Sequence, residues 1–579
     1  MTREPDPHLE RSAAADRQRA RRERAMAALF ALGVLCVYLA SAGGRIVASD
    51  EHTVFRLTQS LVERQSFAVG DGNAERGPDG RLYAKAGLGQ ALVSVPFYLA
   101  GRFTAPLVPA RLRDFYLRAA TSLAMPFAGA VLALALVLLF LELGLGPRPA
   151  LSLALVAALG TPLWVYAKLY LGEILLAACL ALELLGVVRW RRDGRPASAG
   201  LAAAGFGLAV LTKYAVLPVA VALWLPALPA WRRWRSALTF VLAAGAGVAL
   251  ALYYNQARTG SPWGSGYGRQ ASATAFTTPL LVGLYGLLLS SGKGLAWFAP
   301  ISLLAPAGFV AWWKSDRWMA AGAAAGVVAT VLLYAGFEHW AGDGSWGPRY
   351  LVPLIPILVA AVAVRLARRE VPRRRLWWAA VAALGIAGAA VQAGGVAVYY
   401  GAQMREAGDY PYARPLDHPR FMSESHWNPY YSPIQEHWRM LARNLAEHRR
   451  GAAPRVGLAG AAAGDSLAGA ATPPAPARLG LDERQARALT HGFDVWAAYA
   501  VYAGLPAALV LAVWLWLWVA AVGCFAYAWR DGASLARAAA TAARGPLGPP
   551  LGPGPGEPPP LYEPPDDVSR SRWSMTRRP

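Results

Sequence analysis

Cysteine and acidic residues are both scarce in this chain of 579 residues. The three cysteines, Cys36, Cys179 and Cys524, all lie inside apolar stretches, so the sequence suggests neither a disulfide framework nor a thiolate metal site. The 35 Asp and Glu residues are outnumbered by 57 Lys and Arg residues, which gives a formal net charge of +22. Because the basic residues occur in short clusters between apolar spans, this charge does not indicate nucleic-acid binding.

Common nucleotide and metalloprotease motifs are also missing. The chain has no Gly-Xaa-Xaa-Xaa-Xaa-Gly-Lys-Ser/Thr loop, no His-Glu-Xaa-Xaa-His helix and no internal repeat, which counts against nucleotide-driven transport and zincin proteolysis. Apolar sequence is abundant instead, with 55% hydrophobic residues and 22 Trp. Since many windows approach the length that crosses a bilayer, we predict an all-α polytopic membrane protein with about 12 transmembrane helices.

The basic clusters predict the orientation of these helices, because short loops rich in Lys and Arg stay in the cytoplasm. The clusters begin at Arg17, Arg189, Trp231, Lys314 and Arg368. If the apolar segment 87–103 crossed the membrane, two of them would fall outside. We therefore place it at the membrane surface, in a long external loop 45–118 that also holds an amphipathic helix near 51–64.

The predicted organisation has five parts, and both termini are cytoplasmic. They are a basic tail 1–24, a membrane module 25–399, an external soluble and partly disordered segment 400–495, a last transmembrane helix 496–529 and a Pro-rich tail 530–579. The spans of the module are expected at 25–44, 119–143, 150–169, 174–188, 200–215, 216–228, 237–254, 295–313, 318–337, 350–366 and 376–399.

Charged residues gather at the predicted outer ends of the helices. Asp50 and Glu51 follow the first span directly. The others are Lys85, Lys168, Glu173, Lys213, Arg258, Arg269, Lys293, Asp343 and Arg349. A single cation at such a position more often reaches for lipid headgroups. Both signs crowd one rim here, however, and that pattern suits a site that joins a general base to an anion-binding group.

Taken in order, these residues resemble the lipid-carrier-dependent glycosyltransferases of the GT-C fold, the superfamily of the protein O-mannosyltransferases and the lipid A aminoarabinose transferases. The resemblance covers roughly 25–366 and is carried by Asp50-Glu51, by Lys85 before a surface helix, by Leu211-Thr212-Lys213 at a helix end and by Glu173. It implies a GT-C-like bundle in which Asp50 is the catalytic base and Lys85 binds the carrier phosphate.

The activity implied is transfer of a sugar from a polyprenyl-phosphate donor to an acceptor hydroxyl, which needs a base and a cationic pocket for the leaving phosphate. We expect Asp50 and Glu51 to be the catalytic pair. The expected binding residues are Lys85, Arg349, Lys293, Lys213, Arg258, Arg269, Glu173 and Asp343. Relatives with a metal often have an acidic residue before the lysine, where this chain has Ala84. A divalent metal cofactor is therefore left open.

The expected partners are the lipid-linked donor, membrane lipids and a glycan, lipid or protein acceptor, without nucleic acid. We expect a multi-pass protein of the bacterial plasma (inner) membrane with its active site facing outward. Two other classes stay open. A transporter or flippase of a lipid-linked or polar substrate would place charges near the midplane, among broken helices and paired halves. A non-catalytic scaffold for envelope assembly would tolerate loss of Asp50.

Overall fold

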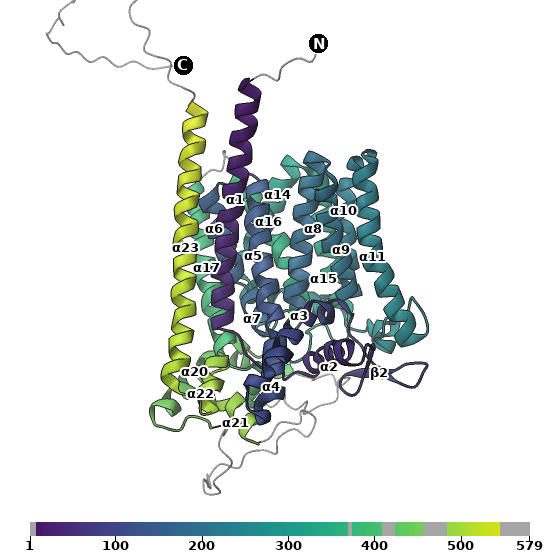
Figure 1. Cartoon of the computed structure of the whole chain (residues 1–579), viewed down its shortest axis with the longest axis vertical. Coiled ribbons are helices and arrows are strands. Elements are labelled where there is room, and N and C mark those ends of the chain that lie inside the picture. The colour runs from purple at the N-terminus through teal and green to yellow at the C-terminus, as the bar shows by residue number, and fades with distance from the viewer. Residues whose placement is uncertain (1–6, 369–372, 408–422, 456–482, 545–579) are drawn as a thin grey trace, which may run out of the picture.

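The long helices of the chain run side by side as one bundle (Figure 1). The structure is a computed structural model and describes residues 7–368, 373–407, 423–455 and 483–544. The bundle is made of α1 (Pro7–Ala40), α5 (Ala124–Glu142), α6 (Pro147–Leu159), α8 (Glu173–Asp193), α9 (Pro196–Thr212), α10 (Leu217–Trp224), α11 (Trp234–Thr259), α14 (Ala305–Ser315), α15 (Arg317–Gly336), α16 (Ile355–Ala367), α17 (Arg374–Ala397) and α23 (Ala507–Arg544).

The apolar character of the bundle fits a membrane interior. In the part of the chain that the structure describes, 8 helices are long and apolar enough to cross a membrane, judged by length and composition. The helices α6, α9 and α12 (Leu280–Leu289) are apolar but shorter, and α8 carries Glu183 together with arginines near its end. The prediction of a polytopic helical protein is confirmed, whereas the count of about 12 spans is not.

Several expected spans are divided by glycine and proline. The segment 496–529 was expected to be one helix, but α22 (Trp496–Tyr502) ends before Gly504, whose φ is +91°. Helix α23 begins only after Pro506. The segment 150–169 is likewise divided at Gly160-Thr161-Pro162 into α6 and α7 (Leu163–Lys168). Gly504 adopts its positive φ without steric cost, and the prolines at both breaks, Pro162 and Pro506, cannot donate a helical hydrogen bond.

Two further differences concern 295–313 and the tails. The expected span 295–313 consists of α13 (Leu295–Phe298), the 3-10 helix η7 (Pro300–Leu304) and α14. The basic run of the expected tail 1–24 continues helix α1, and α23 extends into the expected tail as far as Arg544. The Pro-rich residues 545–579 lie outside the described residues, as do 456–482, where disorder was expected.

The two ends of the bundle differ in what they hold. The N-terminal end of α1 and the C-terminal end of α23 project together (Figure 1), and Arg22 of α1 donates a hydrogen bond to Ser534 of α23. The opposite end, called the loop end below, holds α2 (Ser49–Glu63), α3 (Gly89–Thr104), α4 (Arg113–Ser122), α20 (Pro433–Arg449) and α21 (Glu483–His491) (Figure 1). Helix α3 is not among the candidate spans, which agrees with the surface position expected for 87–103.

A small antiparallel sheet lies beside α2 at the loop end. Its strands are β1 (Ala68–Val69), β2 (Ala74–Arg76) and β3 (Leu82–Ala84), in the order β1-β3-β2. Tyr83 of β3 pairs with Ala68 on one side and with Glu75 on the other. Two residues discussed below lie at the ends of these strands: Asn73 just before β2, and Lys85 just after β3.

Helices α8 and α9 pack closely through glycine. A Cβ atom at Gly186 would lie 2.3 Å from the backbone nitrogen of Ala202, and one at Gly205 would lie 2.5 Å from the carbonyl oxygen of Cys179. Small residues let membrane helices approach in this way. The close packing fixes the start of α8, Glu173, relative to the end of α9, which is followed by Lys213.

Candidate active site

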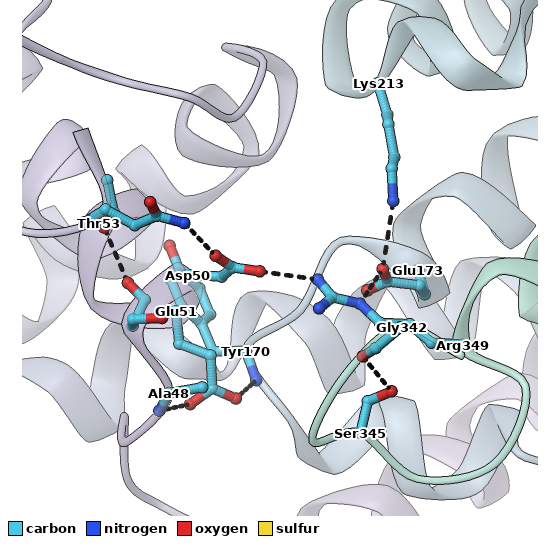
Figure 2. A network of polar contacts seen from close by, with 12 residues as sticks. Ala48, Asp50, Glu51, Thr53, Tyr170, Glu173, Lys213, Gly342, Ser345 and Arg349 are labelled. Carbon is cyan, nitrogen blue, oxygen red and sulfur yellow. Dashed lines mark hydrogen bonds and ion pairs between the residues drawn. The ribbon is translucent and has the colours of Figure 1, made fainter. Parts of the chain in front are cut away.

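Asp50 lies in the first turn of α2, where the helix dipole favours a carboxylate. Its Oδ1 accepts a hydrogen bond of 2.9 Å from Nδ2 of Asn73, and its Oδ2 lies 3.2 Å from Nη2 of Arg349 (Figure 2). The Asp50 side chain is still 42% exposed. The carboxylate is therefore held in place by two neighbours while remaining open to a ligand.

Arg349 joins Asp50 to a second carboxylate. It begins the 3-10 helix η8 (Arg349–Leu354), and its Nε donates a 2.6 Å hydrogen bond to Oε1 of Glu173 (Figure 2). Glu173 is the first residue of α8, and its side chain is only 3% exposed. Its Oε2 has no hydrogen-bond partner among the described residues. Buried carboxylate oxygens are usually satisfied, so this free acceptor marks an incomplete site.

Lys213 completes the group from the segment after α9. Its Nζ lies 3.7 Å from Oε1 of Glu173 and 4.7 Å from the centroid of the Tyr350 ring. Glu173, Lys213 and Tyr350 are among the residues that line a small pocket. The apolar lining includes Leu176, Val216, Val219, Pro353 and Leu354. The pocket thus combines charged groups with an apolar interior.

The electrostatics of Asp50 follow from these neighbours. Burial acts to raise the pKa of its carboxyl group, but the Arg349 guanidinium and the Asn73 amide outweigh burial and hold this pKa below its ordinary value. Asp50 is consequently ionised at neutral pH. A carboxylate that is ionised and partly exposed can accept a proton once a ligand draws Arg349 away.

Glu51, expected beside Asp50 in the catalytic pair, is committed to backbone groups. Its Oε2 accepts hydrogen bonds of 2.9 and 3.0 Å from the N–H groups of Val47 and Ala48, and its Oε1 accepts one of 3.0 Å from Tyr170 (Figure 2). The side chain is buried. Glu51 thereby fixes the start of α2 against the segment before α8, and it does not contact Arg349.

Lys85 and Arg258 lie together on the sheet side of the site. The Nζ of Lys85 lies 3.1 Å from Oε1 of Glu75, and both side chains are partly exposed. Arg258 is buried, and its Nη1 donates to the carbonyl oxygens of Ala84, Lys85 and Ala86 at 3.1, 2.8 and 3.1 Å. Arg258 therefore orders the chain around Lys85 instead of presenting a free cation to a ligand.

The ammonium group of Lys293 is also hydrogen-bonded to the protein backbone. It is buried, and its Nζ donates to the carbonyl oxygens of Asp343 and Ser345 at 2.9 and 2.5 Å. Burial lowers the pKa of Lys293 to about 7. Asp343 is partly exposed, with Oδ1 3.4 Å from Nδ1 of His339. The two residues thus support the loop that leads to Arg349, while the side chain of Arg269 lies outside the described part of the chain.

The carboxylates of the site do not form a donor set for a divalent metal. Oxygen ligands must converge on one ion, but Asp50 and Glu173 are separated by the guanidinium of Arg349. Among the described residues, no group of three or more His, Cys, Asp or Glu side chains could hold a metal ion. The position before Lys85 contributes only the methyl group of Ala84.

Sequence reasoning did not identify two neighbours of the site. Asn73 binds Asp50 directly but lies in a polar turn with no periodic pattern around it. Tyr350 stacks on Tyr334 with ring centroids 4.1 Å apart and an interplanar angle of 5°. Its position directly after Arg349 was the only available signal, because a tyrosine at a membrane helix end is ordinary.

Comparison with known proteins gives a limited result. No family model matches the chain, and no curated protein matches it. Among solved structures, ArnT from Cupriavidus metallidurans bound to undecaprenyl phosphate aligns with a TM-score of 0.39 at 18% identity, covering 73% of this chain and 72% of that one. The apo state of the same protein aligns with a TM-score of 0.40, with the same identity and coverage. Because the identity and the TM-scores are both low, the function proposed below rests on the geometry of the site and not on this likeness.

Proposed function

We propose that this chain is an integral membrane glycosyltransferase that moves a sugar from a polyprenyl-phosphate-linked donor to an acceptor hydroxyl. The observation that carries the proposal is the position of Arg349, which bridges two carboxylates beside Lys213 and an apolar pocket. A lipid tail with an anionic headgroup matches both halves of this arrangement. By the positive-inside rule, the loop end faces outward from the bacterial plasma membrane.

In the proposed reaction, Asp50 accepts the proton of the acceptor hydroxyl. The acceptor oxygen bonds to the anomeric carbon as the bond from that carbon to the phosphate oxygen breaks, and the polyprenyl phosphate leaves with the electron pair. Arg349 and Lys213 stabilise the leaving phosphate. The Nη1 of Arg349 has no hydrogen-bond partner among the described residues, so one edge of the guanidinium is available.

The shared arginine also gives donor binding a role in activating the base. A phosphate on Arg349 competes with Asp50 for the guanidinium, and loss of a nearby positive charge raises the proton affinity of a carboxylate. The free Oε2 of Glu173 can accept a hydrogen bond from a sugar hydroxyl. Donor and acceptor would therefore be selected by adjacent parts of one site.

The test is to incubate the purified protein with a panel of polyprenyl-phosphate sugars and to measure release of polyprenyl phosphate. We expect release from at least one donor, and its loss in Asp50→Asn. Asp71→Asn is the matched control, because Asp71 is exposed and its ion pair, at 3.0 Å, is with Arg56 outside the proposed site. A folded protein that releases nothing from any donor would contradict the proposal.

A transporter or flippase is the second candidate, and one residue favours it. Glu183 lies within α8, is fully buried, and both of its carboxyl oxygens lack hydrogen-bond partners among the described residues. Intramembrane carboxyl groups often mark transport pathways. Flux of a lipid-linked sugar across liposomes that depends on Glu183 but not on Asp50 would favour transport over transfer.

A further inference from the structure

A second charged cluster lies next to the proposed site, and its side chains are buried and paired with one another. Asp494 lies between α21 and α22. Its Oδ1 and Oδ2 accept hydrogen bonds of 2.6 and 2.5 Å from Nε and Nη2 of Arg45. Its Oδ2 also lies 2.5 Å from Nζ of Lys168, and its Oδ1 accepts a 2.6 Å hydrogen bond from Tyr499. The side chains of Arg45, Asp494 and Lys168 are 7%, 2% and 1% exposed.

The two cations of this cluster flank the two carboxylates of the proposed site. Arg45 precedes Asp50 by five residues, in the coil between α1 and α2. Lys168 precedes Glu173 by five residues, at the end of α7. One carboxylate therefore holds together the two segments that present Asp50 and Glu173 to Arg349.

Glu51 provides a second connection between the same two segments. Glu51 accepts hydrogen bonds from Val47 and Ala48 in the first segment and from Tyr170 in the second. Because Asp494 and Glu51 contact these two segments at different residues, they restrict both the distance between the segments and their relative orientation. The separation of Asp50 from Glu173 then depends on Asp494 and Glu51 together.

Asp494 is itself fixed from both sides of the chain. Its N–H donates to the carbonyl oxygen of Ala397 at the end of α17, at 2.8 Å. Two residues on, Trp496 donates through its backbone N–H to Ala42 at 2.8 Å and through Nε1 to Leu39 at 2.9 Å. These hydrogen bonds hold the backbone around Asp494 to the ends of α1 and α17.

We propose that Asp494 is a positioning residue for the transfer reaction, which holds Arg45 and Lys168 so that Asp50 and Glu173 meet Arg349 at the correct separation. The proposal rests on the proposed function of the site. Buried ion clusters contribute little net stability compared with apolar packing, so geometry is the better reason for this one. The neighbouring cations hold the pKa of Asp494 at about 2 against the effect of burial, which keeps this carboxylate ionised at neutral pH.

The decisive experiment is a double-mutant cycle between Asp494→Asn and Asp50→Asn. Asparagine keeps the shape of Asp494 but cannot neutralise two cations. We expect Asp494→Asn to lower kcat by about tenfold to a hundredfold, because small misplacements of reacting groups cost rate of this order, with KM for the donor within about twofold. In the Asp50→Asn background, Asp494→Asn should cause almost no further loss, because its effect passes through Asp50.

Arg45→Lys provides a second variant, since it keeps the cation and loses only the paired hydrogen bonds. Glu142→Gln is the matched control: Glu142 pairs with Arg189 at 2.8 Å and Arg192 at 2.5 Å at the end of α5, and this variant should leave kcat unchanged. Equal losses from Asp494→Asn with and without Asp50 would overturn the positioning role.

Amide hydrogen exchange provides a readout that does not need activity. Asp494→Asn and Arg45→Lys should speed exchange at the N–H groups of Val47, Ala48 and Tyr170, whereas Glu142→Gln should not. Unchanged exchange in both variants would overturn the inference. Faster exchange in a protein that transfers no sugar would remove the proposed function and still support Asp494 as the tie between the two segments.

Discussion

In the described part of the chain, an arginine and a lysine meet a carboxylate at Asp494 and again at Glu173, and the two clusters differ in how exposed they are. Around Asp494, the cations and the carboxylate are almost wholly buried and bonded to one another. Around Arg349, the Asp50 side chain is 42% exposed and the Arg349 side chain 18% exposed, while Glu173 keeps an oxygen without a described partner. Both places hold an arginine, a lysine and an aspartate, and the Arg349 cluster adds Glu173.

The comparison teaches that charge alone does not identify a site in such a protein. A cluster that is complete within the protein can fix geometry but has nothing to offer a ligand. A cluster with spare donors, a spare acceptor and an open side can exchange partners. Each prediction below either removes one of these unpaired or exposed groups or tests whether the Arg349 site is where a ligand binds.

The largest effect is expected from Asp50→Asn, which keeps the shape of the side chain and removes its basicity. Turnover should fall by on the order of a hundredfold or more, because general bases contribute rate factors of this size or larger. Release of polyprenyl phosphate measures turnover, and the unfolding temperature in detergent checks the fold. Near-normal turnover in a folded variant would move the base elsewhere, with Glu173 the next choice.

Arg349→Ala should have the next largest effect, because it removes the group shared by Asp50, Glu173 and the phosphate. We expect turnover to fall by about a hundredfold, the lower end of the range seen when a transition-state donor is lost, and binding of polyprenyl phosphate to weaken. Arg349→Lys keeps the positive charge but loses the planar set of guanidinium donors, so comparing it with Arg349→Ala shows which of the two properties the site needs. Alanine at Arg102, a partly exposed residue near the end of α3, is the control and should bind normally.

Glu51→Gln should act on stability more than on chemistry. The amide can accept at only one of the two oxygens, which leaves buried backbone N–H groups unpaired at a cost of about 1–3 kcal/mol. A lower unfolding temperature with a smaller loss of turnover than in Asp50→Asn is the expected pattern. A loss of turnover equal to that of Asp50→Asn, with unchanged stability, would return Glu51 to the catalytic pair.

The pH dependence tests the role of the shared arginine. Because the folded-state pKa of Asp50 is below its ordinary value of 3.8, its charge and the stability it confers are present above that value and are lost only as pH falls through the lowered pKa. The acid limb of kcat/KM due to Asp50 should thus lie below pH 3.8. If the donor phosphate draws Arg349 away, the limb of kcat should lie at higher pH. Coincident limbs would contradict competition for Arg349.

The smallest effect is expected from Lys85→Ala. Lys85 forms a partly exposed pair with Glu75, and such pairs contribute at most about 1 kcal/mol. We expect donor binding to weaken by less than in Arg349→Ala, with unchanged stability, as measured by titration with polyprenyl phosphate. A larger loss of binding than in Arg349→Ala would shift the phosphate site toward the sheet.

The sequence predicted the members of the site better than their partners. Asp50, Glu173, Lys213 and Arg349 could be named because each stands at a predicted helix end, and the structure brings these four together. Their pairing depends on contacts across as many as 299 residues, which no local pattern encodes. Lys293 and Arg258 looked equally available, because a sequence cannot distinguish a free cation from one that donates to backbone carbonyls.

The fold could be predicted in class but less well in detail. Apolar length identified the bundle, and the basic clusters are the reason for the prediction that 87–103 lies at the membrane surface. The breaks at Gly160 and Gly504 were missed because apolar content continues across them, although glycine and proline stood in the sequence at both places.

The bond between Arg45 and Asp494 joins residues 449 positions apart, and this separation sets an order for biosynthesis. When Arg45 leaves the ribosome, Asp494 is still roughly 20 to 90 seconds from being made at ordinary rates of translation. During that interval, Arg45 and, once it is made, Lys168 lack the carboxylate that pairs with both of them in the finished protein. The pairing of the two segments through Asp494 can therefore form only after residue 494 has been made.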